Sequence, residues 1–274
     1  MDTLGAASPP PSPPATAVTE PSAHPSGLTD GLAVEAIPGK GQGVRATRRF
    51  ARGETVLAEA ALFTQGLRRT HASVLGALAR CTPAQRAAFY ALSPGGHAGR
   101  HPAALAVFET NVLPCGGNDA HGHVAARGGL FLLGARFNSS CVPNVNNHWD
   151  ATRGLLVFRA LRDVEPGEEL CLAYGKLLAT RDERRAEMRA KFGFECQCEA
   201  CSLTGKALAE SDARRECLGS IYASHLQGAY GDPMEGLGEV SSSVPPACAV
   251  NPRLKFLEGC ACGADASRRT SAGV

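Results

Sequence analysis

Three cysteines lie within six residues, at Cys196, Cys198 and Cys201. Thiolates at this spacing suit tetrahedral zinc, with each sulfur about 2.3 Å from the metal, but three ligands leave a structural zinc site one short. Taken alone, Cys198 and Cys201 could instead be a redox pair, although they do not follow a strand and open a helix as a thioredoxin-like motif would. Ordinary buried cysteines are the third possibility. The pattern favours zinc.

A second segment, residues 136–144, reads Arg-Phe-Asn-Ser-Ser-Cys-Val-Pro-Asn. Its two asparagines and its serine pair lie in a non-periodic stretch directly after the apolar residues 130–133. This density of polar side chains suits recognition of a polar ligand. Cys141, beside a valine and a proline, is on its own most simply a packing residue.

A third segment, residues 40–45, is the glycine-rich Lys-Gly-Gln-Gly-Val-Arg. Glycines at this spacing let backbone N–H groups approach a ligand closely. The segment is not a phosphate-binding loop, because it has neither the Walker spacing with Lys-Ser/Thr nor a following helix pattern.

The composition restricts the class of protein that carries these segments. The chain has 274 residues, 44% of them hydrophobic, enough for one compact domain with appendages. A net charge of +2 gives no reason to expect a polyanion-binding or membrane-coating protein. No apolar run approaches the roughly 18–20 residues of a spanning helix, and the first basic residue, Lys40, comes too late for a secretory signal or a mitochondrial presequence. We therefore expect a nuclear or cytosolic protein whose 11 cysteines are not disulfide-bonded.

Short apolar runs separated by glycine turns predict the strands that position the three segments. These runs cover residues 32–37, 55–63, 155–160 and 169–173. Between the last two runs, residues 165–168 read Glu-Pro-Gly-Glu, with proline and glycine at the positions that a type II turn requires.

Two capping boxes predict helices. Thr82 and Gln85 open one that ends near Leu92, and Thr180 opens a charged one that runs toward Phe192. Acidic residues interleave with the arginines of the second helix, which favours a solvated face over a nucleic-acid patch.

The two ends of the chain are less regular. Residues 1–27 are rich in proline, alanine and serine and are expected to be a disordered leader. Residues 204–274 are weakly patterned, with loop-like clusters after Tyr230, and are expected to be a partly disordered extension.

Together with Gly-Glu-Glu-Leu-Cys-Leu-Ala-Tyr at 167–174, the three segments resemble the SET domain of protein-lysine methyltransferases, in the family's order. The resemblance is closest to the SMYD-like and fungal SET group and covers residues 31–201, without the MYND finger of SMYD proteins. It implies an α+β fold of small β-sheets around a threaded pseudoknot segment. The implied parts are a SET domain (28–178) containing a helical insert (64–128), a post-SET helix and zinc tail (179–203), and the extension.

The resemblance also supplies a fourth metal ligand, because in SET proteins with this tail the cysteine of the middle segment joins the tail cysteines on one structural zinc ion. The ligands here would be Cys141, Cys196, Cys198 and Cys201. Such a site would tie the tail to the domain and hold Phe192 and Phe194 over the active site.

The implied activity is methyl transfer from S-adenosylmethionine to a neutral lysine amine. Tyr174 matches the catalytic tyrosine at the methyl-transfer pore, and Phe192 would line the lysine channel with it. Asn138 is expected at the amino-acid end of the cofactor, Lys40 and Gln42 at its carboxylate, and the backbone of Ser139 at its adenine. The full set of expected cofactor contacts is Lys40, Gly41, Gln42, Gly43, Asn111, Asn138, Ser139 and Phe194.

Two positions depart from the family pattern: Ser139 replaces the usual histidine, and Phe192 replaces a frequent tyrosine. Because of Ser139, the main alternative is a catalytically inactive SET module that binds a protein partner. A third possibility is a zinc adaptor without a cofactor site. The expected partner is a protein with an exposed lysine, histone or non-histone. No nucleic acid or membrane partner is expected, and the chain is expected to be a monomer in the nucleus or cytoplasm.

Overall fold

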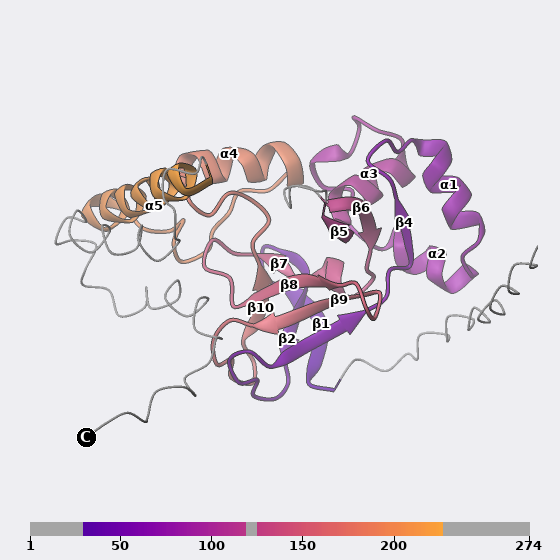
Figure 1. Cartoon of the computed structure of the whole chain (residues 1–274), viewed down its shortest axis with the longest axis horizontal. Helices are drawn as coiled ribbons and strands as arrows, with labels where there is room; N and C mark the ends of the chain where they lie inside the picture. The colour runs from indigo at the N-terminus through magenta and orange to yellow at the C-terminus, as the bar shows by residue number, and fades with distance from the viewer. Residues whose placement is uncertain (1–29, 119–124, 227–274) are drawn as a thin grey trace, which may run out of the picture.

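The computed structural model describes residues 30–118 and 125–226 of the chain. The leader expected over residues 1–27, and the part of the expected extension beyond residue 226, lie outside the described residues. Three small β-sheets occupy the middle of the described part, with helices at both ends (Figure 1).

The first sheet joins segments that are far apart in the sequence. Its strand order is β1-β2-β10-β7. The bounds are Leu32–Ile37 for β1, Gly41–Ala46 for β2, Glu169–Leu172 for β10 and Asn138–Ser139 for β7. The short β7 pairs parallel with β10, Asn138 opposite Cys171 and Ser139 opposite Leu172, whereas the other pairs are antiparallel. This sheet therefore brings the glycine-rich segment, the polar segment and the Gly-Glu-Glu-Leu strand together.

Two antiparallel three-stranded sheets complete the β-structure. One has the order β3-β9-β8, and its strands are Thr55–Glu59, Leu155–Ala160 and Val145–Asp150. The other has the order β4-β6-β5, and its strands are Phe63–Gln65, Ala125–Leu130 and Val112–Asn118.

Most of the predicted strands are confirmed, and one is divided. The strand predicted over 55–63 is divided into β3, which ends at Glu59, and β4, which begins at Phe63 in another sheet. The N–H of Leu62 already donates to the Leu130 carbonyl of that second sheet, at 2.7 Å. The predicted type II turn is confirmed by Gly167, whose φ is 88°, and by the 3.1 Å bond that closes residues 165–168.

The region expected as a helical insert contains a β-hairpin as well as helices. The helices are α1 (His71–Ala79), α2 (Pro83–Tyr90), the short η1 (Gly95–His97) and α3 (Ala103–Asn111). Strands β5 and β6 form the hairpin, which pairs with β4 through β6. The strand character of β5 and β6 was not predicted, because each strand contains two consecutive glycines, Gly116 and Gly117 in β5 and Gly128 and Gly129 in β6, which hide the alternation in the sequence. The capping box at Thr82 is confirmed.

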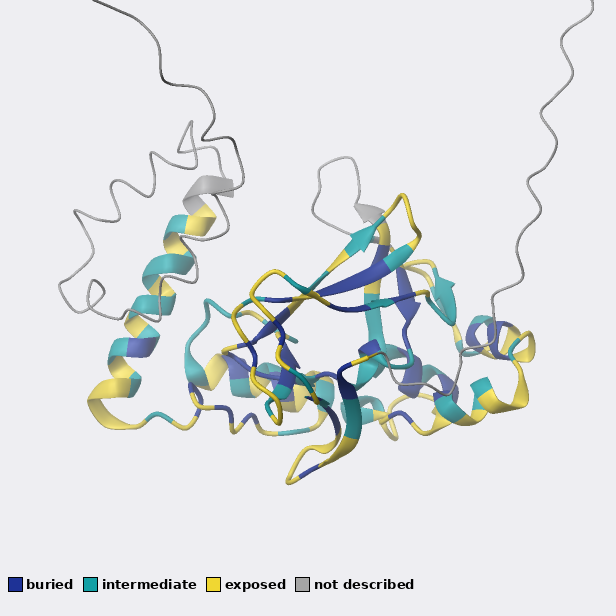
Figure 2. Ribbon diagram, turned by 90° about the horizontal axis from the view of Figure 1, so that it is seen from below, coloured by how far each residue is buried: buried dark blue, intermediate teal, exposed yellow. Residues whose placement is uncertain are grey.

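Two helices follow the last strand of the first sheet: α4 reaches the insert with its C-terminal end, whereas α5 lies at the opposite end of the described part from α1 and α2 (Figure 1). Helix α4 (Arg181–Phe192) begins with the predicted capping box at Thr180 and ends at Gly193, whose φ of 76° is the left-handed conformation that glycine adopts freely. Helix α5 (Gly205–Leu226) was not predicted, because its apolar residues show no marked helical stripe. Figure 2 shows why: α5 is mostly intermediate or exposed, whereas buried residues concentrate in the sheets.

The main core lies between the first two sheets. Phe50, Phe131, Phe137 and Phe158 are fully buried in it, and Phe137 stacks on Phe158 with ring centroids 5.0 Å apart. Removing such a ring costs about 3–5 kcal/mol. Since Phe137 directly precedes β7, the polar segment is anchored to the core at its start.

Candidate active site and metal centre

The segment from Asn138 to Asn144 is bound to β10 along its length. The buried Asn144 side chain donates to the Glu169 carbonyl at 2.9 Å and accepts from the N–H of Cys171 at 2.8 Å. The N–H of Ser140 donates to the Leu172 carbonyl at 2.8 Å. Because one amide side chain replaces two strand hydrogen bonds here, the segment can leave the regular ladder without orphaned backbone groups.

Glu59 fixes the chain just before this segment. Its carboxylate is only 6% exposed and accepts hydrogen bonds from the N–H groups of Leu133 and Gly134, at 3.1 and 2.8 Å. These residues lead into η2 (Gly134–Arg136). A carboxylate at a helix start satisfies donors that the helix itself cannot. Glu59 was not predicted from the sequence; the signal that marks it is a charged residue at the end of an apolar strand.

Glu169 joins two residues expected at the cofactor. Its carboxylate accepts from Lys40 Nζ at 2.6 Å and from Asn138 Nδ2 at 2.9 Å. Burial lowers the pKa of Lys40, but the hydrogen bond and charge of Glu169 outweigh burial and raise it, so the ammonium is fixed as a cation. This hydrogen bond uses the Nδ2 of Asn138 and leaves its Oδ1 as the acceptor of the side chain. From the sequence, Glu169 is only part of a strand motif, and its role at this site was not predicted.

Gly43 makes this approach possible. A Cβ at position 43 would lie 2.5 Å from Ile37 Cγ1 and 2.6 Å from Asn138 Nδ2, closer than real Cβ contacts allow. Only glycine therefore lets β2 pass beside the Asn138 amide.

Tyr174 follows β10 and lies beside two aromatic residues of the tail. Its hydroxyl donates to the Phe137 carbonyl at 2.6 Å, and burial raises the pKa of the phenol, which keeps it protonated. The rings of Tyr174 and Phe192 have centroids 4.8 Å apart, and those of Phe192 and Phe194 are 6.4 Å apart. Three aromatic residues predicted to share a site are thus neighbours.

The insert supports these rings from outside. A Cβ at Gly193, between the two phenylalanines, would lie 2.9 Å from the N atom of Gly96. Arg100 also donates to the Ala190 carbonyl at 2.6 Å, near the end of α4. The η1 loop is therefore packed against the turn that carries the tail aromatics.

Four cysteine sulfurs meet in the cluster against which these aromatic rings pack. The Sγ atoms of Cys141, Cys196, Cys198 and Cys201 all lie within 4.8 Å of one another. Cys141 Sγ is 4.0 Å from Cys196 Sγ and 3.6 Å from Cys201 Sγ. Four sulfurs at tetrahedral zinc, each about 2.3 Å from the metal, would be about 3.8 Å apart. The donor set and its spacing therefore fit zinc.

The hydrogen bonds in this cluster favour thiolate at Cys198 and Cys201, whereas hydrogen bonds with the neighbouring sulfurs raise the pKa of Cys141. The N–H of Cys141 donates to Cys198 Sγ at 3.4 Å. Hydrogen bonds from the Cys141 thiol lower the pKa of Cys198, and they lower that of Cys201 to about 6. A thiolate is the form in which cysteine binds metals.

Other expected cofactor residues are less closely grouped. The Asn111 amide donates to the carbonyls of Ser93 and Val107, both at 2.7 Å, so its nitrogen is used within the insert. Gln42 is exposed on β2, next to the exposed Gly41. Phe194 is half-buried against the cysteine cluster.

Ser139 lies between the aromatic rings and the cysteines. It is 8% exposed, and its Oγ is 3.9 Å from Met188 Sδ. It lines a small cavity of about 10 Å³ together with Tyr174 and Met188. This volume is about that of one water molecule.

Within residues 30–118 and 125–226, none of the helices combines the length and the hydropathy that crossing a bilayer requires.

The chain is similar to named lysine methyltransferases. Histone-lysine N-methyltransferase set5 of Schizosaccharomyces pombe is 31% identical over 183 residues, which are 66% of this chain and 54% of set5. Human histone-lysine N-methyltransferase SMYD3 is 38% identical over 78 residues, 28% of this chain and 18% of SMYD3. Human protein-lysine N-trimethyltransferase SMYD5 is 37% identical over 87 residues, 31% of this chain and 19% of SMYD5.

Only part of each relative is matched, since this chain spans about half the length of set5 and less than a fifth of each of the two SMYD proteins. The SET domain family matches residues 41–175, an interval that holds the glycine-rich segment from Gly41 on, the polar segment 136–144 and Tyr174. The expected α+β fold of small sheets is confirmed. The chain therefore contains a SET domain, and the proteins similar to it include fungal Set5 and the SMYD lysine methyltransferases.

Proposed function

We propose that this chain is an S-adenosylmethionine-dependent protein-lysine N-methyltransferase. The observation that carries the proposal is the convergence of Lys40, Asn138 and Tyr174 from three segments that are distant in the sequence, tied together by Glu169 and Phe137. The similarity to set5 and to SMYD proteins supports the same reaction class.

The proposed roles follow the sequence expectations, with Glu169 added as the group that orients Lys40 and Asn138. Tyr174 is the proposed catalytic residue, and it lines the substrate channel with Phe192. The proposed cofactor-binding residues are Lys40, Gly41, Gln42, Gly43, Asn111, Asn138, Ser139 and Phe194. The proposed division of the chain is a SET domain over residues 28–178, with its insert at 64–128, and a post-SET tail over 179–203.

S-adenosylmethionine supplies the methyl group on an electrophilic sulfonium. The residues of this chain must then present a neutral lysine amine and surround the methyl with oxygen. Phe192 and the ring of Tyr174 form apolar walls, and desolvation between such walls lowers the pKa of a lysine amine. Because the Tyr174 proton is donated to the Phe137 carbonyl, the lone pairs of the hydroxyl oxygen are left for weak C–H···O contacts with the methyl.

Zinc would be held by Cys141, Cys196, Cys198 and Cys201. Four sulfur ligands complete a tetrahedron and leave no open position for water, so the metal would be structural. Tyr174, Phe192 and Phe194 pack against the cysteine cluster. The proposed role of the metal is therefore to hold the tail aromatics beside the catalytic tyrosine.

The proposed substrate is a protein with an exposed lysine, histone or non-histone. We further propose a monomer, acting in the nucleus or the cytoplasm without direct nucleic-acid or membrane binding; the near-neutral charge of +2 supports the last point.

Two measurements test the proposed activity. Calorimetry with S-adenosylmethionine is expected to show binding, and its absence would remove the enzyme proposal. Labelled cofactor is then incubated with the protein and a whole-cell extract, and the labelled lysine is mapped by mass spectrometry. Cofactor binding without transfer to any protein would favour the inactive SET module, for which Ser139 in place of the family histidine is the specific argument.

A further inference from the structure

A buried arginine lies against the cysteine cluster. Arg184 of α4 is only 2% exposed, and it is the largest fully buried side chain in the described residues. Its Nη2 is 3.8 Å from Cys201 Sγ, and its Nη1 donates to the Ala179 carbonyl at 2.5 Å. A guanidinium is costly to bury unless opposite charge lies nearby.

The carboxylate nearest to Arg184 compensates it incompletely. Asp212 Oδ1 is 3.7 Å from Arg184 Nη1, and the same oxygen accepts a shorter bond of 2.9 Å from the N–H of Arg181. Within the described residues, the Nε of Arg184 is buried without a hydrogen-bond partner. The protein side chains alone therefore give little reason for a cation at this place.

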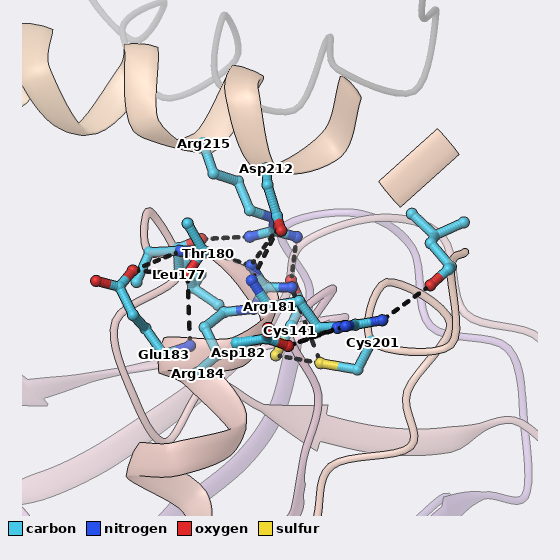
Figure 3. Close-up of polar contacts among 12 residues, drawn as sticks. Cys141, Leu177, Thr180, Arg181, Asp182, Glu183, Arg184, Cys201, Asp212 and Arg215 are labelled. Carbon is cyan, nitrogen blue, oxygen red and sulfur yellow. Dashed lines mark hydrogen bonds and ion pairs between the residues drawn. The ribbon is translucent and has the colours of Figure 1, made fainter. Parts of the chain in front are cut away.

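A second guanidinium reaches the same cluster from α5. Arg215 donates from Nη2 to the Cys141 carbonyl at 3.1 Å and from Nη1 to the Leu177 carbonyl. In Figure 3, Arg215 and Asp212 extend from α5 toward Arg184 and the sulfurs of Cys141 and Cys201. Helix α5 thus contacts the metal-binding region through charged side chains rather than through a large apolar face.

The charge of a metal centre at this place would explain both arginines. Four cysteine thiolates on one zinc dication carry a net charge of −2, in a cluster whose side chains are at most 9% exposed. Arg184 against a sulfur and Arg215 against a ligand carbonyl are opposite in sign to that charge and together equal it in magnitude. Arg185 also donates to the carbonyls of Cys196 and Cys201, but its own charge is paired with Glu195 at 3.1 Å.

We propose that Arg184 and Arg215 compensate the charge of the tetrathiolate zinc centre and thereby couple zinc binding to the docking of α5. The proposal rests on the zinc centre of the proposed function. Coupling is reciprocal, so zinc strengthens the docking of α5 by the same factor by which docked α5 strengthens zinc binding.

The first test measures zinc affinity of the full chain by competition with a chromophoric chelator. Arg184→Met and Arg215→Met each lower the affinity about 10- to 100-fold, the usual effect of losing a partner of a metal ligand. Arg184→Lys, which keeps the charge, recovers part of the loss. Arg189→Met is the matched control, because Arg189 lies on the same helix and pairs only with the exposed Glu195 in the described contacts of its side chain.

Melting temperatures of the zinc-free protein distinguish the proposed role of Arg184 from a purely structural one. If Arg184 merely stabilised the fold, Arg184→Met would lower the melting temperature of the zinc-free and zinc-bound forms alike. The proposal expects the zinc-free form to melt at an unchanged or higher temperature, because the variant removes an uncompensated buried charge.

The second test follows α5 directly by hydrogen exchange of the full chain before and after chelation of zinc. Exchange is expected to rise over residues 205–226 and to stay unchanged over α3 of the insert. Wild-type protein that binds no zinc would overturn the metal centre and this inference together. This inference alone would be overturned if both arginine variants bound zinc with unchanged affinity, or if hydrogen exchange over α5 did not change on chelation.

Discussion

The hydroxyl of Tyr174 donates a hydrogen bond of 2.6 Å to the carbonyl oxygen of Phe137. Phe137 is fully buried and stacks on Phe158 in the main core, so the tyrosine expected at the pore is positioned by the core itself. The same carbonyl immediately precedes Asn138, the residue expected at the amino-acid end of the cofactor. One hydrogen bond therefore sets the distance between the proposed catalytic and cofactor-binding groups.

Replacing Tyr174 with phenylalanine tests this arrangement. Tyr174→Phe should reduce methyl transfer about 100-fold or more, in the range seen when one preorganised polar group is removed from an active site. The zinc content should not change, because the ring still packs on the cysteine cluster. Transfer of labelled methyl and metal analysis check both points. Tyr90→Phe is the control, since Tyr90 is 49% exposed on α2, and full activity of Tyr174→Phe would show that the pore is assigned wrongly.

Glu169→Gln tests the carboxylate that orients Lys40 and Asn138. A neutral amide loses the charge that holds Lys40 and can offer an N–H to the Asn138 amide, which reverses its orientation. We expect the dissociation constant for S-adenosylmethionine to rise about 10-fold, or about 1.4 kcal/mol, by calorimetry.

The neighbouring Glu168 provides the control for this variant. Its carboxylate pairs with Arg162 at 2.7 Å on the surface, so Glu168→Gln should bind the cofactor like the wild type. Equal affinities of the two variants would leave Glu169 without the proposed orienting role.

If the metal centre is correct, replacing two buried cysteines with serine has different effects on the zinc content. Cys141→Ser should lose the bound zinc, because it removes one of four ligands and the link between tail and domain. Cys115→Ser makes the same chemical change at a residue that is 1% exposed and lies in the main core. Mass spectrometry of the metal content should therefore find zinc in Cys115→Ser only, and retention of zinc by Cys141→Ser would contradict the four-cysteine site.

The insert carries an ion pair whose contribution to stability depends on pH. Glu109 of α3 accepts two hydrogen bonds from Arg69, at 2.7 and 2.8 Å, and these hold the pKa of Glu109 below its usual value. The stabilisation is complete above the unfolded pKa of about 4.3 and is lost as the pH falls through the lower folded pKa.

Glu109→Gln should accordingly lower the free energy of unfolding by about 1–2 kcal/mol at neutral pH, between the values for exposed and buried pairs. Below the folded pKa the difference from the wild type should disappear. Urea unfolding at several pH values measures this, with the exposed Glu165→Gln as control. A difference that persists unchanged at low pH would show that Glu109 acts by packing rather than by charge.

Much of the local structure could be predicted from the sequence alone. The capping boxes at Thr82 and Thr180 and the turn at Pro166-Gly167 are confirmed, because caps and turns depend on side chains within four residues of each other. The cysteine spacing likewise pointed to zinc, and the polar segment 136–144 was recognised by its dense group of polar residues. Helix α5 and the hairpin of β5 and β6 were missed, since neither has a local pattern stronger than its glycines and charges.

The roles of Glu59, Glu169 and Arg184 were decided only by the tertiary structure. Each is a charged residue on a segment that reads as an ordinary strand or solvated helix, and its partners lie 74, 129 and 17 residues away along the chain. The sequence determined which chemical groups are available and which short elements they occupy. Which charge meets which sulfur, amide or carbonyl was decided by the packing of the sheets, because an ionic group is held in a buried place only when the fold brings its partner to it.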